Sequence, residues 1–138
     1  MEDDILILGG GAAGLMAAIA AKRAAPGARV TILEAGDRVG KKILSTGNGR
    51  CNLTNLRAQA EDYAPAPVGA VLGQFPPERV LAAFAQMGLC FREEEDGRVY
   101  PASDPASSVL DALRLTCAHL GVRERTGFLA VRARRGRE

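Results

Sequence analysis

The sequence predicts an α/β fold built on a parallel β-sheet. A continuous apolar run, Ile5-Leu6-Ile7-Leu8, is followed by a glycine-rich turn and then by a segment of good helix formers that begins at Ala12. A second β-rich run, residues 29–33, closes a strand–helix–strand unit of about 30 residues. Such units join parallel strands through a right-handed crossover, and the fold class follows from this connection.

The residue types of this first unit indicate its packing. An uninterrupted apolar run such as residues 5–8 is typical of a strand covered on both faces, so we expect it to be a central strand. The helix is expected to run from Ala12 to about Ala25 and to stop at Pro26-Gly27. Apart from small alanines, its sheet-facing side chains are expected to be Leu15, Met16 and Ile19.

Beyond residue 34 the predicted elements are shorter and less regular. Residues 35–55 are expected to form a long loop with one helical turn, and residues 57–74 a connector. Helix and turn signals then predict a helix from Pro76-Pro77 to about Met87 and a β-hairpin of residues 89–94 and 98–100 around Asp96-Gly97. A further helix is expected to be capped by Asp104, to start at Pro105 and to stop at Gly121, with an apolar stripe of Val109, Leu110, Leu113 and Leu120. A strand at 122–125 and a half-buried strand within 126–138 are expected to follow.

Composition excludes several function classes. The chain has 138 residues and a formal net charge of +2, which gives no global field for nucleic acid or a membrane surface. No apolar stretch approaches the roughly 20 residues that cross a bilayer, and the acidic N-terminus is unlike a signal peptide, so we expect a cytoplasmic protein. The three separated cysteines form no Cys-x-x-Cys pair, which argues against a disulfide framework, a zinc site and a dithiol centre. Redox chemistry would therefore come from a bound cofactor.

The turn after the first strand matches a dinucleotide-binding fingerprint. Residues 9–14 read Gly-Gly-Gly-Ala-Ala-Gly, a Gly-x-Gly-x-x-Gly pattern between a strand and a helix, as in the Rossmann fold. Glycines there allow a tight turn, close approach of the backbone to a pyrophosphate and close helix–strand packing. Backbone N–H groups of the helix N-terminus stabilise the phosphates. Glu34 stands at the end of the second strand, where a carboxylate accepts hydrogen bonds from a ribose diol. The pattern predicts a site for an ADP moiety, which both FAD and NAD contain.

A second motif follows the acidic residue. Residues 40–55 combine two lysines, an arginine, amides and hydroxyls in a glycine-broken loop. Such a loop suits a cofactor, because glycines let the backbone come close and Lys or Arg offsets phosphate charge. On the residues alone, an ordinary Asn-Gly turn with solvated lysines is an equal alternative.

With this loop, the sequence resembles the BaiN/YhiN-like, or aminoacetone oxidase, family of bacterial FAD-binding flavoproteins. In that family a Gly-Lys-Lys-x-x-x-Ser/Thr-Gly-Asn-Gly-Arg-Cys-Asn-x-Thr-Asn run follows the dinucleotide fingerprint. The likeness continues through residues 75–78, 97–101 and 106–110. It implies a glutathione-reductase-type FAD-binding domain, incomplete and with a small β-hairpin. The implied cofactor-binding residues are Gly9, Gly11, Ala12, Ala13 and Gly14 at the pyrophosphate, Glu34 at the adenosine ribose, and Lys42, Thr46, Gly47, Asn48, Arg50 and Asn52 along the rest of FAD.

The resemblance also implies a domain organisation. Family members are several times longer, with a substrate domain and a C-terminal return of the FAD domain that carries a second glycine motif. Residues 1–138 are then expected to be the N-terminal part of an FAD-binding domain, with those two parts absent from a truncated or fragmentary chain.

Other reactive side chains show no catalytic pattern. Cys51 has no Cys-x-x-Cys partner or neighbouring His to activate it, and His119 suits a partner for a helix C-terminus. The arginines of residues 123–137 lack aromatic neighbours for stacking bases, and the acidic run at 93–96 suits a hairpin tip. We therefore expect no catalytic side chain, no metal site, no nucleic-acid partner and no membrane partner.

Three hypotheses remain for the function. The first is an FAD-dependent oxidoreductase, in which the isoalloxazine accepts and passes on a hydride or electron pair, with an unidentified small-molecule substrate and NAD(P)H as a candidate electron donor. The second keeps the fold but binds NAD as a dehydrogenase domain, which leaves the 40–55 loop without a purpose. The third is an inactive fragment that binds ADP-like ligands weakly or not at all.

Overall fold

A parallel three-stranded sheet forms the centre of the first of two units in the chain, residues 1–42 with 113–138. The computed structural model describes residues 3–63 and 67–134. The elements of this unit are β1 (Ile5–Leu8), α1 (Ala12–Ala24), β2 (Val30–Glu34), β6 (Arg123–Thr126) and the part of α4 (Ser107–His119) from Leu113 onward. Both β1 and β6 pair in parallel with β2, so the predicted parallel sheet and its strand–helix–strand unit are confirmed.

The strand order corrects one expectation. The described strands lie in the order β1-β2-β6, so β2 is the central strand, and its residues Val30, Thr31 and Ile32 are buried. Strand β1 pairs only with β2 among the described strands, and its Leu6 and Leu8 are 49% and 56% exposed. The prediction of a central strand covered on both faces is therefore wrong for β1, because an apolar run does not specify which neighbours a strand acquires.

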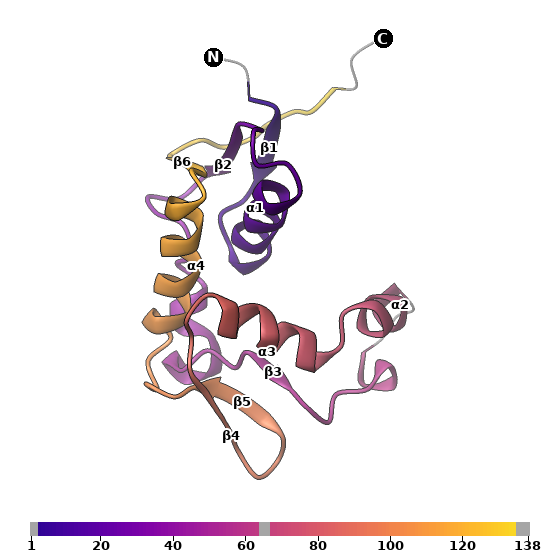
Figure 1. Cartoon of the computed structure of the whole chain (residues 1–138). Helices are drawn as coiled ribbons and strands as arrows, with labels where there is room; N and C mark the ends of the chain where they lie inside the picture. The colour runs from indigo at the N-terminus through magenta and orange to yellow at the C-terminus, as the bar shows by residue number, and fades with distance from the viewer. Residues whose placement is uncertain (1–2, 64–66, 135–138) are drawn as a thin grey trace. The chain divides into compact units, whose positions relative to one another are not determined.

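Helix α1 packs against both β1 and β2 (Figure 1). Its buried side chains are Leu15, Ala18 and Ile19, whereas Met16, expected to face the sheet, is half-buried. On α4, Leu113 and Cys117 are also buried, and the Cys117 thiol lies 3.7 Å from the Leu15 carbonyl oxygen. The helix faces of this unit therefore form one apolar core with the sheet.

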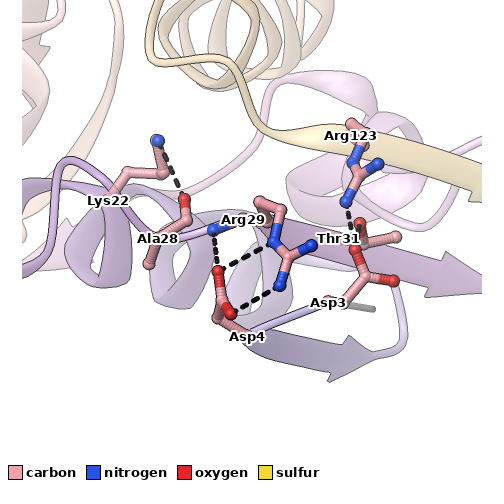
Figure 2. Close-up of polar contacts among 7 residues, drawn as sticks. All are labelled: Asp3, Asp4, Lys22, Ala28, Arg29, Thr31 and Arg123. Carbon is pink, nitrogen blue, oxygen red and sulfur yellow. Dashed lines mark hydrogen bonds and ion pairs between the residues drawn. The ribbon is translucent and has the colours of Figure 1, made fainter. Parts of the chain in front are cut away.

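Charged side chains join the start of β1 to the other two strands (Figure 2). Asp4 receives two hydrogen bonds from the Arg29 guanidinium, at 2.9 and 3.1 Å, and one from the Arg29 backbone N–H. Asp3 accepts a hydrogen bond from the hydroxyl of Thr31, the buried polar residue of β2, at 2.7 Å, and pairs with Arg123 of β6. One short acidic segment therefore bridges all three strands at this end of the sheet.

The second unit, residues 43–112, contains a small antiparallel sheet and the remaining helices. Its elements are the 3-10 helix η1 (Ile43–Gly49), β3 (Thr54–Asn55), η2 (Ala60–Asp62), α2 (Pro67–Gln74), α3 (Pro77–Gln86), β4 (Phe91–Glu93), β5 (Arg98–Pro101) and the first part of α4. The strand order is β3-β5-β4, and Figure 1 shows β4 and β5 as a hairpin. The predicted hairpin is confirmed, with Gly97 at a φ of +82° as the left-handed residue of its turn.

Two segments before the hairpin contain secondary structure that their sequences do not predict. The 35–55 loop ends in β3, whose two residues pair with Val99 and Arg98 of β5. The predicted connector 57–74 contains η2 and the helix α2, while its residues 64–66 lie outside the described part of the chain. Helix α3 matches the prediction, with Phe84 buried and Gly88 following at a φ of +81°.

Two predictions in the last third of the chain are corrected. Helix α4 begins at Ser107 rather than at Pro105, because the Asp104 carboxylate accepts hydrogen bonds from Arg92, at 2.5 and 3.2 Å, instead of capping the helix. Its buried stripe is Val109, Leu110, Leu113 and Cys117, with Leu120 half-buried.

The predicted strand within 126–138 is not formed over residues 127–134, where Leu129 and Val131 are 74% and 88% exposed, and residues 135–138 lie outside the described range. Of the described residues 126–134, only Thr126 belongs to a strand, as the last residue of β6. Within the described residues, no helix combines the length and apolar character that crossing a membrane requires.

Candidate dinucleotide-binding site

The glycine turn between β1 and α1 requires glycine for two different reasons. Gly9 has a φ of +94°, a conformation that a residue with a Cβ rarely adopts. Gly14 lies in the first turn of α1, and a Cβ there would be 1.9 Å from the Gly9 carbonyl oxygen and 3.5 Å from a methyl carbon of Ile7. The first glycine therefore makes the turn possible, and the last lets α1 pack directly onto it.

The middle residue of the turn is a glycine as well, and the structure gives a reason for it. A Cβ on Gly10 would lie 2.5 Å from Cγ1 of Val39. The Gly40 N–H also donates to the Gly10 carbonyl oxygen at 2.7 Å. Gly10 therefore packs against the loop that follows β2, a contact that the fingerprint pattern does not specify.

The N-terminus of α1 is open for an anion. Gly11 is the N-cap residue, so no side chain caps the helix, and its first turn contains no acidic residue. Gly11, Ala12 and Ala13 are exposed, and a Cβ on Gly11 would meet no atom within 4 Å. The backbone N–H groups of a helix start and the positive end of its dipole stabilise phosphate oxygens. This end of α1 therefore has room and polarity for a pyrophosphate.

Glu34, at the end of β2, directs its carboxylate back to the glycine turn. Its Oε2 accepts a hydrogen bond from the Gly10 N–H and its Oε1 one from the Gly36 N–H, each at 2.7 Å. These bonds, that of Gly36 first, lower the pKa of Glu34 below its ordinary value, and the nearby Lys42 charge contributes in the same direction. The carboxylate is therefore ionised at neutral pH and can accept further hydrogen bonds, as from a ribose diol.

These groups surround one pocket of about 390 Å³. That volume is within the usual range of roughly 300 to 1,000 Å³ for ligand pockets. The pocket is lined by Gly9, Gly10, Gly11, Glu34, Gly36, Arg38, Gly40, Lys41 and Lys42. Four of the predicted cofactor residues, Gly9, Gly11, Glu34 and Lys42, are among them, and Ala12, Ala13 and Gly14 form the adjoining first turn of α1.

Five lining residues were missed by the sequence reasoning: Gly10, Gly36, Arg38, Gly40 and Lys41. The signal was present in the sequence, since each lies within the fingerprint or within seven positions after Glu34. Lys41 also pairs with Asp37 at 3.3 Å on the surface. The loop after β2 therefore contributes a basic rim to the pocket.

Lys42 belongs to the first unit, whereas the other predicted residues of the second motif lie on one tight loop of the second unit. Gly47 and Asn48 have φ values of +53° and +54°, and they break the 3-10 helix η1. The Thr46 hydroxyl donates to the Ile43 carbonyl oxygen at 2.7 Å. A Cβ on Gly47 would lie 2.8 Å from the backbone nitrogen of Asn52, so the loop folds back on itself here. Thr46, Gly47, Asn48 and Asn52 are all exposed and remain predictions as cofactor contacts.

Arg50 has partners within its own unit. Its guanidinium lies 3.8 Å from the centre of the Tyr100 ring and pairs with the Glu94 carboxylate at 2.7 Å. These contacts tie the loop to the β4–β5 hairpin. Cys51 is buried next to Arg50 at a φ of +57°. His119 stands in the last turn of α4, as expected.

Comparisons with known proteins agree with this fold and motif. Residues 3–135 match the family described as the HI0933-like protein Rossmann domain. The chain is 47% identical over 124 residues to the 3-dehydro-bile acid delta(4,6)-reductase of Clostridium scindens, covering 88% of this chain and 30% of that protein. It is 31% identical over 121 residues to a ribosomal RNA dihydrouridine synthase of Haemophilus influenzae, covering 86% and 29%. The chain thus spans less than a third of the length of these relatives.

A solved structure shows the same fold. The crystal structure of Thermovibrio ammonificans THI4 superposes with a TM-score of 0.59 at 17% identity, over 91% of this chain and 38% of the other. The predicted fold class, a Rossmann-like domain of the FAD-binding type, is confirmed by these matches and by the parallel sheet. The family resemblance inferred from the 40–55 loop is confirmed with it, and the chain belongs to the HI0933-like protein Rossmann domain family.

Proposed function

We propose that this chain binds the ADP portion of FAD and serves an FAD-dependent oxidoreductase. The observation that carries the proposal is the pocket at the glycine turn, in which the open start of α1 and the ionised Glu34 face one space. A pyrophosphate needs backbone donors and a ribose diol needs an acceptor. The pocket offers backbone donors at the start of α1 and an acceptor at Glu34, close together in space.

The residues present fit this cofactor. The room at Gly11 lets a phosphate come close to the backbone, and the N–H groups of the exposed residues Ala12 and Ala13 would bind its oxygens. Glu34 would accept the ribose hydroxyls, and Lys42 would offset the phosphate charge. Thr46, Gly47, Asn48, Arg50 and Asn52 would hold the remainder of FAD, as the family resemblance implies. When bound, the flavin supplies hydride or two-electron chemistry, and none of these side chains needs to act as an acid or a base.

The relatives support redox chemistry of a reductive kind. One is named a reductase and another a dihydrouridine synthase, and a dihydrouridine is a uridine with one carbon–carbon double bond reduced. We therefore propose a compound with a reducible carbon–carbon double bond as the class of substrate. NAD(P)H is the proposed electron donor and the cytoplasm the proposed location. Because the chain spans only 30% of the first relative, the activity is proposed for a protein of that family and the ADP site for this chain.

Purification and ligand titration test the proposal. The purified chain is scanned for flavin absorbance and then melted with FAD, ADP, NAD and adenosine. We expect FAD and ADP to raise the melting temperature with concentration, since a ligand at 100 times its Kd adds about 2.7 kcal/mol to stability. Adenosine, which lacks phosphates, is the control and should have little effect. Tight binding of NAD without uptake of FAD would show that the cofactor is NAD and not FAD. No response to any of these nucleotides would reject the proposed site.

A further inference from the structure

The Glu34 carboxylate contacts both walls of the pocket. Oε2 accepts from the N–H of Gly10, in the glycine turn, and Oε1 accepts from the N–H of Gly36, in the loop after β2. Gly10 is 24 positions from Glu34 along the chain, so the first of these bonds is a tertiary contact. One side chain therefore joins the two segments that face each other across the site.

The same two segments are also in contact beside the carboxylate. The Gly40 N–H donates to the Gly10 carbonyl oxygen at 2.7 Å, and Val39 packs so closely on Gly10 that a Cβ there would lie 2.5 Å away. Gly10 thus has its N–H, its carbonyl and its Cα all engaged by residues 34–40. The position of the glycine turn depends on that loop, and Glu34 supplies its charged contact.

We infer that Glu34 is a positioning residue, which holds the glycine turn and the 36–42 loop in the shape that receives a nucleotide diphosphate, in addition to its proposed contact with the ribose. We call the two hydrogen bonds from Gly10 and Gly36 to Glu34 the clamp. A carboxylate oxygen accepts more than one hydrogen bond, so the clamp leaves Glu34 able to accept bonds from the ribose hydroxyls as well. Without the carboxylate, the N–H groups of Gly10 and Gly36 lose their acceptor. The turn would then relax from the conformation that presents Gly11 and the start of α1 to the phosphates.

The two roles of Glu34 predict different effects of Glu34→Gln on the affinity for a ligand without ribose hydroxyls. If Glu34 only contacts the ribose, Glu34→Gln leaves the affinity for 2',3'-dideoxy-ADP unchanged or improves it, because a negative charge near the phosphates is removed. If Glu34 also positions the turn, the same variant weakens this ligand. We expect a loss of about tenfold, the lower end for a hydrogen bond to a charged group.

Amide hydrogen exchange tests the clamp in the protein without ligand. In the wild-type chain we expect the amides of Gly10 and Gly36 to exchange more slowly than that of Ala12. Protection of the two glycines should fall in Glu34→Gln and further in Glu34→Ala, with the amides at the centre of β2 unchanged. A merely destabilised fold would lower protection throughout the unit. Glu95→Gln, which removes the same charge from the β4–β5 turn, is the matched control and should change neither measurement.

The ligand measurement rests on the proposed function, whereas the exchange measurement does not. If wild-type chain binds neither ADP nor dideoxy-ADP, the proposed function fails and exchange alone decides the clamp. If ADP binds and Glu34→Gln holds dideoxy-ADP as tightly as the wild type, the positioning role is rejected and the site stands. If the variants do not fold, the wild-type chain alone decides: amides of Gly10 and Gly36 that exchange as fast as the amide of Ala12 would overturn the inference.

Discussion

The Cα of Gly14 faces the carbonyl oxygen of Gly9 so closely that a Cβ on Gly14 would lie 1.9 Å from that oxygen. The first turn of α1 and the glycine turn before it are therefore packed backbone against backbone. A flexible side chain could move aside from such a clash, but a carbonyl within a tight turn cannot. The helix start and the turn must shift together if either is changed.

Gly14→Ala is expected to damage both stability and nucleotide binding. The added methyl group displaces α1 from β1, and overpacking of this kind typically costs about 1–3 kcal/mol. Urea unfolding measures the first effect, and titration with ADP measures the second. A variant with wild-type stability and ADP affinity would contradict the close packing of Gly9 and Gly14.

Gly11→Ala is the matched substitution and should separate the two effects. A Cβ there meets no atom within 4 Å, and the φ of −77° suits alanine. We expect the free energy of unfolding to change by about 1 kcal/mol or less. Affinity for ADP should nevertheless fall, because the methyl group occupies space at the pocket where the backbone would approach a phosphate. Isothermal titration of both variants compares them, and unchanged ADP binding by Gly11→Ala would count against the proposed phosphate position.

Glu34 should make the stability of the chain depend on acid pH. Because the pKa of Glu34 is lowered in the folded chain, its contribution to stability is complete above the unfolded value, near 4.5, and is lost as the pH falls through the folded value. The stability difference between wild type and Glu34→Gln should therefore be constant near neutral pH and disappear in acid. Urea unfolding of both proteins between pH 7 and pH 3 measures it. A difference that persists unchanged at pH 3 would show that the charge is not responsible.

Arg50 should stabilise its own unit through Glu94 and Tyr100. Arg50→Ala removes an ion pair and a contact with the face of an aromatic ring. Since both charged side chains are about one-third exposed, we expect a loss of only about 1 kcal/mol. Arg50→Lys keeps the charge but not the planar stack, so it should recover part of the loss. Thermal unfolding with Glu94→Gln in a double-mutant cycle measures the pair.

The same variant tests the predicted cofactor role of Arg50. If Arg50 contacts the part of FAD beyond the ADP moiety, Arg50→Ala lowers the affinity for FAD and leaves that for ADP unchanged. If its role is confined to the loop and hairpin, both affinities follow stability alone. The ratio of the two dissociation constants distinguishes these cases.

The three cysteines should differ in their reaction with a thiol reagent. Cys90 is exposed, whereas Cys51 and Cys117 are buried. Burial also raises the pKa of the Cys117 thiol to about 11, so very little of the reactive thiolate is present at pH 8. With a disulfide reagent at pH 8, one thiol should react rapidly in the folded chain and the others only in denaturant. Cys90→Ser should remove the rapid phase, and its persistence would contradict the burial of the other two.

Local patterns in the sequence predicted much of the fold around the candidate site. Strand β1, helix α1 and strand β2 were recognised because an apolar run, a glycine turn and a run of helix formers follow one another directly. The left-handed turns at Gly88 and Gly97 were recognised for the same reason, since glycine tolerates a φ that other residues avoid. Glu34 was identified from its place at the end of the second strand, and the pocket contains it.

Tertiary contacts decided what these patterns could not. The apolar run of β1 is compatible with a central or an edge strand. Among the described strands it pairs with β2 alone, and its Leu6 and Leu8 are exposed. Thr54 and Asn55 form a strand because they pair with β5. The Asp104 carboxylate, predicted to cap a helix, accepts a hydrogen bond from Arg92 instead. Each outcome depends on a partner chosen from elsewhere in the chain.

The sequence by itself therefore determined the fold class, the glycine turn and the acidic residue of the candidate site. These features depend on backbone conformations and residue types within about 30 positions, the length of one strand–helix–strand unit. Only the tertiary structure showed that Glu34 bonds to Gly10 and Gly36, that Val39 packs on Gly10, and that Arg50 lies against Tyr100. The reason is physical: a carboxylate or guanidinium binds whichever donors, acceptors or rings the folded chain brings within reach.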